Sequence, residues 1–167
     1  MSKVYVSTYG NYSSGNLKGA WVDCENFSDK EDFVKHCLSL FPKQRDPELM
    51  FQDYEDFPRA YYSESNIKEE LWDDYLRLND NEKEIVNLGL DHGIADNARD
   101  CLERFHGVHN TPEDWAQETL EETGMFENVP KELVYYFDFE AYASDCQLSG
   151  DVSFIREHGY TYVFNNY

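Results

Sequence analysis

The sequence predicts an α+β fold, and three stretches of it carry this prediction. Residues 3–24 alternate strand-forming side chains around a cluster of Gly, Ser and Asn, which is typical of two strands joined by a loop. Residues 65–107 instead place apolar side chains at helical spacing. Residues 150–164 are typical of two strands joined by a tight turn. With 167 residues, the chain forms one domain or a string of two or three small ones.

The N-terminal part is expected to contain a small sheet. Strands are predicted near residues 4–8, 18–23 and 49–54. Between the last two, Ser28 is placed as the N-cap of a helix with acidic residues in its first turn. Pro42 ends this helix, because proline cannot continue it. The apolar stripe of the helix comprises Phe33, Cys37, Leu38 and Phe41.

The middle of the chain is expected to form three short helices. The first covers residues 65–78, with its charged side chains away from the apolar stripe. Two shorter helices follow over residues 80–93 and 94–107, and each ends in glycine, a common C-terminal stop. The stripe of the first helix comprises Ile67, Leu71, Tyr75 and Leu78.

The C-terminal part contains the helix with the clearest boundaries. Thr111 is its N-cap, Pro112 occupies the first helical position and Gly124 ends it. Another short helix is expected from Pro130, running into an irregular aromatic stretch, before a hairpin that turns at residues 157–159. The buried stripe of the first helix is expected to comprise Trp115, Ala116, Thr119 and Leu120.

The charge of the chain is extreme and graded. The net charge is −20, from 34 carboxylates against 14 Lys plus Arg, whereas a magnitude of about 2–8 keeps a small domain soluble. Residues 1–60 carry −3, residues 61–105 carry −7 and residues 106–167 carry −10. This balance argues against direct binding of nucleic acid or an anionic membrane. Because no apolar run resembles a leader or a membrane span, a cytoplasmic protein is expected.

The number of charges permits an imitation of DNA without establishing one. B-DNA carries one charge per about 1.7 Å of axis, so twenty charges correspond to roughly ten base pairs, and a two-fold dimer to roughly twenty. A compact globule of this length, with a radius of gyration near about 15 Å, would spread the charges over a sphere. A rod of small modules could lay them out in lines. The alternative is a solvated acidic face with no further role.

Sites for metals and for catalysis are not supported by the spacing of residues. The calcium-loop candidate at residues 23–33 has Ser28 where glycine is needed and Phe27 at a ligand position. Cys101, His106 and His109 lie close in sequence, but no second pair completes a zinc site. Motifs for a P-loop, a dinucleotide or a catalytic serine are also missing. We therefore expect no cofactor, no metal and no catalytic residue, and interpret the four scattered cysteines as buried thiols.

The chain resembles the ArdA antirestriction proteins of plasmids, conjugative transposons and phages over nearly its whole length. The stretches that carry the resemblance are "VYVSTYGNYSSGNLKGAWVD", "FQDYEDFP", "EETGMFENVPKELVYYFDFEAYASDC" and "YTYVF". The first of them contains a framework formed by Tyr12, Gly15, Leu17, Gly19 and Trp21.

This resemblance implies an elongated, curved α+β protein of three small modules that imitates bent B-form DNA. The modules are expected at residues 1–60 (sheet plus helix), 61–107 (short helices) and 108–167 (helices plus hairpin), the last forming a homodimer. The implied partner is a type I restriction-modification enzyme, whose DNA-binding groove in the methyltransferase core the protein would fill without enzymatic activity. The expected phosphate surrogates are Glu69, Glu70, Asp73, Asp74, Glu113, Asp114, Glu118, Glu121, Glu122, Glu127, Asp138, Glu140, Asp145 and Asp151.

The aromatic stretch is expected to supply either the seam between two copies or the adjoining core, since aromatic residues are frequent in both settings. Its members are Phe126, Tyr135, Tyr136, Phe139 and Tyr142. Two alternatives to the mimic stay open at this point. One is a carboxylate-rich metal-dependent hydrolase, and the other is an acidic adaptor that binds some other basic protein.

Overall fold

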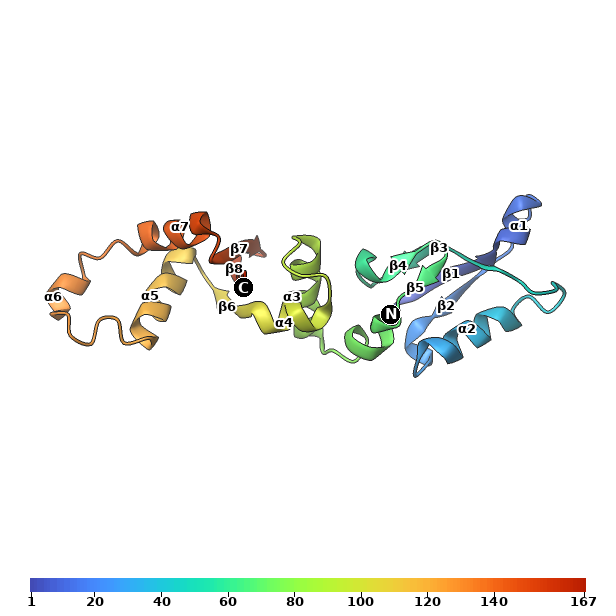
Figure 1. Ribbon diagram of the computed structural model, residues 1–167, viewed down its shortest axis with the longest axis horizontal. Helices are drawn as coiled ribbons and strands as arrows, with labels where there is room; N and C mark the ends of the chain where they lie inside the picture. The colour runs from blue at the N-terminus through green and yellow to red at the C-terminus, as the bar shows by residue number, and fades with distance from the viewer.

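The computed structural model describes residues 1–167, which form an elongated molecule (Figure 1). Three small antiparallel sheets and several helices follow one another along its long axis, and the α+β prediction is confirmed. The first sheet lies at one end, and helices α5 (Pro112–Glu122), α6 (Lys131–Val134) and α7 (Phe139–Ser149) lie toward the other. Helices α3 (Asp80–Asp91) and α4 (Ala98–Arg104) connect the two halves.

The first sheet has the order β2-β1-β3 and uses the strands predicted from the sequence. They are β1 (Lys3–Thr8), β2 (Ala20–Asp23) and β3 (Leu49–Glu55). The loop between β1 and β2 begins with a short helix, α1 (Tyr9–Ser13), which was not predicted. Gly19 enters β2 so close to β1 that a Cβ there would lie 2.6 Å from the carbonyl oxygen of Val6. Only glycine fits this approach, because any side chain would collide with the backbone of β1.

Helix α2 (Lys30–Ser39) covers this sheet but begins one residue later than expected. Asp29, not Ser28, is its N-cap, because the Asp29 carboxylate accepts a hydrogen bond from the backbone N–H of Asp32 at 2.9 Å. A short 3-10 helix, η1 (Cys24–Asn26), precedes α2. Phe33 and Cys37 are fully buried. Leu38 is exposed, so the buried stripe is narrower than predicted.

The prediction of a helix over residues 65–78 is wrong for the first half of this segment. A 3-10 turn, η2 (Arg59–Tyr61), leads into a two-stranded sheet of β4 (Tyr62–Ser63) and β5 (Asn66–Ile67). Only a π-helical segment, η3 (Leu71–Tyr75), follows. The apolar stripe is nonetheless buried, because a hairpin and a helical turn present the same side chains to one core.

Helices α3 and α4 were predicted, and side chains cap both of their N-termini. Asn79 and Glu82 form a reciprocal capping box at α3, and Asn97 caps α4. Gly93 follows α3 in the left-handed region, as expected for a stop. Gly107 does not end α4. It lies inside β6 (Phe105–His109), where the pairing register with the neighbouring strand shifts and a bulge needs its φ of 133°.

The third sheet has the order β6-β8-β7. Strands β7 (Val152–Glu157) and β8 (Tyr160–Asn165) form the predicted hairpin, with positive φ at His158 and Gly159. Thr111 caps α5 as expected. The irregular aromatic stretch was predicted wrongly in its second half, which is α7, capped by Asp138 and ended by Gly150.

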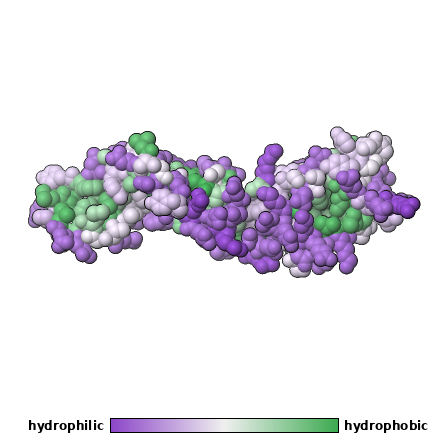
Figure 2. Space-filling model, viewed as in Figure 1, coloured by the Kyte–Doolittle hydropathy of each residue, from purple (hydrophilic) through white to green (hydrophobic).

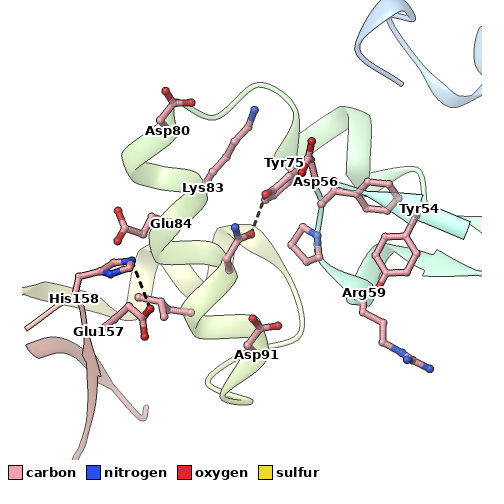
Figure 3. A pocket seen from close by; sticks show the side chains of 14 residues that line it. Tyr54, Asp56, Arg59, Tyr75, Asp80, Lys83, Glu84, Asp91, Glu157 and His158 are labelled. Carbon is pink, nitrogen blue, oxygen red and sulfur yellow. Dashed lines mark hydrogen bonds and ion pairs between the residues drawn. The ribbon is translucent and has the colours of Figure 1, made fainter. Parts of the chain in front are cut away.

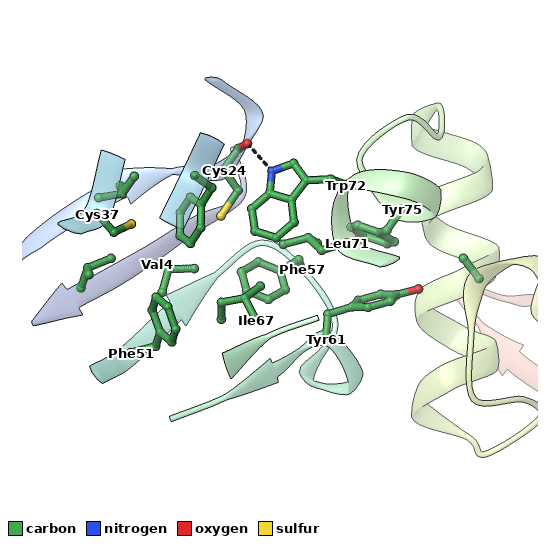
Figure 4. Close-up of a cluster of buried hydrophobic side chains, with 14 of the residues drawn as sticks. Val4, Cys24, Cys37, Phe51, Phe57, Tyr61, Ile67, Leu71, Trp72 and Tyr75 are labelled. Atoms are coloured by element: carbon green, nitrogen blue, oxygen red, sulfur yellow. Dashed lines mark hydrogen bonds between the residues drawn. The ribbon is translucent and has the colours of Figure 1, made fainter. Parts of the chain in front are cut away.

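Three hydrophobic cores hold these elements together. The largest joins the first sheet and α2 to η3, α3 and α4 (Figure 4). A second packs α5 and α7 on β7 and β8, and a third packs α3 against the third sheet. Residues on both sides of the boundary expected at residue 60 therefore share one core, and the division into three modules stays a prediction.

The cysteines are free thiols, and three of them lie in the largest core. Burial raises the pKa of Cys24 and of Cys37 to about 12, and that of Cys101 to about 11. Cys146 on α7 is only partly buried. The interpretation as buried thiols is therefore confirmed for Cys24, Cys37 and Cys101.

Candidate partner-binding surface

The carboxylates selected from the sequence all lie at the surface of the rod. Most of them are exposed, while Asp74 and Asp114 are partly covered and none is buried. Those of residues 69–74 lie on or just before η3, and the others extend over α5, the loop after it, and α7. Because the elements follow one another along an elongated body, these groups are distributed along its length (Figure 1).

Helix α5 carries five carboxylates, more than any other helix. Trp115, Ala116 and Leu120 face the core. Its 11 residues also carry Glu113, Asp114, Glu118, Glu121 and Glu122, none of which is buried. A helix of this length extends about 16 Å, which gives about one carboxylate per 3.3 Å. One strand of B-DNA carries one phosphate per about 3.4 Å of axis, so the linear density of charge on α5 is that of a single DNA strand.

Few of these acids are neutralised by a neighbouring cation. The Lys and Arg ion pairs are Lys3–Glu55 at 2.8 Å, Arg77–Asp73 at 3.7 Å and Arg99–Asp74 at 3.6 Å. Two surrogates predicted in the middle of the chain are therefore paired. Exposed pairs of this kind contribute only about 0–1 kcal/mol, so a partner can replace them. No carboxylate in residues 106–167 pairs with Lys or Arg.

Glu118 is the member of the α5 row that has a basic neighbour. Its Oε2 lies 3.0 Å from Nδ1 of His109, a mostly covered side chain on β6. The contact lacks the direction of a hydrogen bond, and both ring nitrogens of His109 are otherwise unpartnered. The two side chains form an ion pair only when His109 is protonated.

Some of the predicted surrogates also hold the local structure. The Asp138 carboxylate accepts a hydrogen bond from the backbone N–H of Ala141 at 2.9 Å and thereby caps α7. Asp151 accepts from the hydroxyl of Ser149 at 2.8 Å. These two side chains are held in fixed positions, whereas most of the others are free to meet a partner.

A polar cleft of about 810 Å³ lies where the two halves of the rod meet (Figure 3). It is bordered by residues 54–59, by α3 and by the turn of the β7–β8 hairpin. Sequence reasoning missed its carboxylates, because they come from segments that only the fold brings together. The carboxylates that line it are Asp56, Asp80, Glu84, Asp91 and Glu157, alongside Arg59, Lys83 and His158.

Glu84 connects this cleft to the third sheet through a hydrogen bond. Its Oε1 accepts a hydrogen bond from the hydroxyl of Tyr162 at 2.7 Å. This bond, together with burial, raises the pKa of Tyr162 to about 12. The neutral phenol therefore persists to high pH and fixes α3 against β8, which helps to hold the two halves of the rod in one orientation.

The residues considered for zinc do not come together. Cys101 is buried in the largest core, and Nδ1 of His106 accepts a hydrogen bond from the indole N–H of Trp115 at 3.2 Å. No group of three or more His, Cys, Asp or Glu side chains has the arrangement of a metal site. No helix combines the length and the apolar character that crossing a membrane requires.

An exposed apolar surface lies at the end of the rod that carries α6 (Figure 1), and Figure 2 shows apolar side chains gathered there. Tyr135 is 86% exposed and Tyr136 is 80% exposed, so neither belongs to a core. Phe126 and Phe139 are partly buried and lie against Phe137 at 5.2 Å and 4.9 Å between ring centres. Tyr142 is also partly buried. We call this surface the apolar end and define it by Met125, Val129, Leu133, Tyr135, Tyr136 and Phe137.

Comparison with known proteins identifies one protein family. The model described as "ArdA: Antirestriction protein (ArdA)" matches residues 4–162, which include both the acidic surface and the apolar end. A comparison with curated proteins gives no match.

Proposed function

The chain belongs to the ArdA family of antirestriction proteins, and from this premise we propose that it imitates DNA and occupies the DNA-binding groove of type I restriction-modification enzymes. The proteins of this family are inhibitors without enzymatic activity. The target surface in this proposal is the groove in the methyltransferase core. Inhibition is then competitive, because DNA and the protein need the same groove.

The observation that carries this proposal is the row of carboxylates on α5 that no Lys or Arg neutralises. A groove that binds DNA presents Lys and Arg to phosphates. Carboxylates at the linear density of one DNA strand offer the same cations a comparable set of partners. The field of a chain with net charge −20 also steers the encounter with a basic groove and accelerates association.

The acids fall into two groups in this proposal. The C-terminal group acts through carboxylates that pair with no Lys or Arg, while Asp73 and Asp74 of the middle group exchange Arg77 and Arg99 for cations of the enzyme. The cleft at the junction adds the acids Glu84, Asp91 and Glu157, beside Arg59, Lys83 and His158. The C-terminal group comprises Glu113, Asp114, Glu118, Glu121, Glu122, Glu127, Asp138, Glu140, Asp145 and Asp151, and the middle group comprises Glu69, Glu70, Asp73 and Asp74.

The experiment that tests this function is a competition assay. A labelled DNA duplex is bound to a type I methyltransferase core and titrated with the protein at several salt concentrations. We expect the protein to displace DNA fully, and the protein's own affinity for the core to fall as salt rises. A complex that contains DNA, enzyme and the protein together would contradict competitive occupancy and favour an adaptor.

The apolar end is proposed to join two copies of the chain, in line with the expectation that residues 108–167 dimerise. Exposed large apolar side chains gathered at one end of a highly charged rod mark an interaction surface. A two-fold dimer joined there would place forty charges along one body, equivalent to about twenty base pairs.

Truncation of the apolar end tests the dimer. We expect the double variant Leu133→Ala, Tyr135→Ala to sediment as a monomer at concentrations where the unmodified chain is dimeric, because it removes apolar area from the interface. Sedimentation equilibrium measures the change. The matched control is Tyr12→Ala, Leu17→Ala, which removes a similar exposed pair at the opposite end. An unchanged mass for the first variant would place the seam elsewhere.

A further inference from the structure

The N-terminal end of the rod differs in charge from every other part of the molecule. Residues 9–22 and 33–45 contain four Lys or Arg side chains and no Asp or Glu, in a chain of net charge −20. We call these two segments the N-terminal tip. Its cations are Lys18, Lys35, Lys43 and Arg45. Positive and negative side chains are therefore unevenly distributed, which the net charge does not show. The tip carries cations alone, and the carboxylates lie in the remainder of the chain.

The fold brings the two segments of the tip together. Helix α1 and the loop after α2 lie at the same extremity of the molecule (Figure 1). The side-chain N–H of Gln44 donates to the amide oxygen of Asn11 at 2.8 Å, and the Asn11 side chain donates to the backbone carbonyl of Lys18 at 3.1 Å. Asn11 is only 8% exposed, so this network fixes the separation of the two segments.

The cations of the tip are free to meet a partner. None of them forms an ion pair, in contrast to Lys3, Arg77 and Arg99 elsewhere on the chain. The first acids after the tip, Asp46 and Glu48, follow at the base of the loop. With these two acids included, residues 9–22 and 33–48 carry a net charge of +2.

The tip also offers apolar surface and a concave shape. A cleft of about 430 Å³ between its two segments is lined by Lys18 and Lys43 together with Leu40, Phe41 and Pro42. Beside it, Leu17 is 74% exposed and Tyr12 is 56% exposed. A cleft with apolar walls and cations along it suits a protein surface that presents carboxylates around an apolar side chain.

We propose that the N-terminal tip is a second docking surface, which binds an acidic patch of the target enzyme beyond the end of its DNA-binding groove. This inference rests on the proposed function. A basic groove repels the tip and attracts the rest of the rod, so the tip lies outside the groove. Contact with an acidic patch there fixes both the direction and the register of the rod. Duplex DNA and a second copy of the chain are less suitable partners for the tip, because the net charge of −20 repels both.

Two variants with the same net charge distinguish this role from a general effect of charge. The tip variant is Lys18→Gln, Lys43→Gln, Arg45→Gln, and the control variant is Lys68→Gln, Arg77→Gln, Lys83→Gln in the middle of the rod. The affinity of each for the methyltransferase core is measured by titration. We expect the tip variant to bind about tenfold more weakly, as for three lost exposed ion pairs. The control variant should bind as tightly as the unmodified chain or more tightly, because it removes cations from the acidic surface.

The outcomes separate this inference from the proposed function. If the unmodified chain does not displace DNA, the proposed function is wrong. If it displaces DNA but the tip variant binds equally well or more tightly, the second docking surface is wrong and the mimic stands. Thermal unfolding of both variants shows that they are folded, which is expected because the replaced tip side chains are exposed and unpaired.

A measurement on the unmodified chain provides an independent test. Lysine acetylation is followed by mass spectrometry with and without the methyltransferase core. We expect Lys18 and Lys43 to be protected in the complex. Equal acetylation of Lys18 and Lys43 with and without the enzyme overturns the proposal, as does protection by duplex DNA alone.

Discussion

Replacing all five carboxylates of α5 with amides is expected to weaken inhibition roughly 70-fold, while each single replacement changes it only about twofold. The variant carries Gln at residues 113, 118, 121 and 122 and Asn at residue 114. An exposed ion pair contributes about 0.5 kcal/mol, so five of them sum to about 2.5 kcal/mol if they act independently. Competition with DNA for the methyltransferase core measures the loss.

A matched variant shows whether position matters or only the number of charges. Glu31, Asp32, Asp46, Glu48 and Glu64 are exposed, and their carboxylates accept no hydrogen bonds. Changing these five to amides alters the net charge equally but leaves the α5 row intact. We expect a loss of affinity below about fivefold, which arises from the weaker long-range field alone. Equal losses for both variants would mean that inhibition depends on the total negative charge of the chain and not on the spacing of the carboxylates on α5.

The α5 row could be predicted from sequence because everything that defines it is local. Thr111 and Pro112 begin the helix, Gly124 follows its end, and the period of Trp115 and Leu120 determines which side faces outward. The capping residues and the spacing of the apolar side chains predict the same helix, and the structure contains it. The exposure of the other predicted acids follows for a similar reason, since unpaired carboxylates are costly to bury.

Features that depend on distant segments could not be predicted in this way. Residues 65–78 have helical periodicity, yet Ile67 pairs with Tyr62 in a hairpin, because both hairpin and helix bury the same stripe. The cleft at the junction needs the β7–β8 turn beside α3, a contact between residues more than sixty positions apart. The pairing of Arg99 with Asp74 likewise depends on the packing of α4 near η3. The net charge of a segment can be summed from its sequence. Whether a carboxylate has a cation beside it depends on the fold, because the cation can come from a distant segment.

The second large effect is expected in the core that joins the first sheet to the middle of the rod. Figure 4 shows Trp72 within this core. Trp72 is 2% exposed, and its ring centre lies 4.9 Å from that of Phe33. Its indole N–H donates to the backbone carbonyl of Cys24 at 3.0 Å. Trp72→Ala leaves a large cavity and an unpaired buried carbonyl, and we expect it to lower the free energy of unfolding by about 3–5 kcal/mol. Urea denaturation followed by circular dichroism measures this change.

The size of this effect decides whether the rod stays folded. A domain of this length is stabilised by about 5–15 kcal/mol, and we expect repulsion among the carboxylates to lower the stability of this chain within that range. We therefore expect Trp72→Ala to be largely unfolded at low salt and to regain structure as added salt screens the carboxylates.

Trp21→Ala is the control, because Trp21 is 43% exposed on the edge strand β2 and this variant should lose less than about 1.5 kcal/mol. Equal losses at the two positions would show that Trp72 does not hold the two halves together. Since α3 and α4 pack on this same core, a rod weakened at Trp72 should also inhibit the enzyme less at low salt, even though every carboxylate is still present.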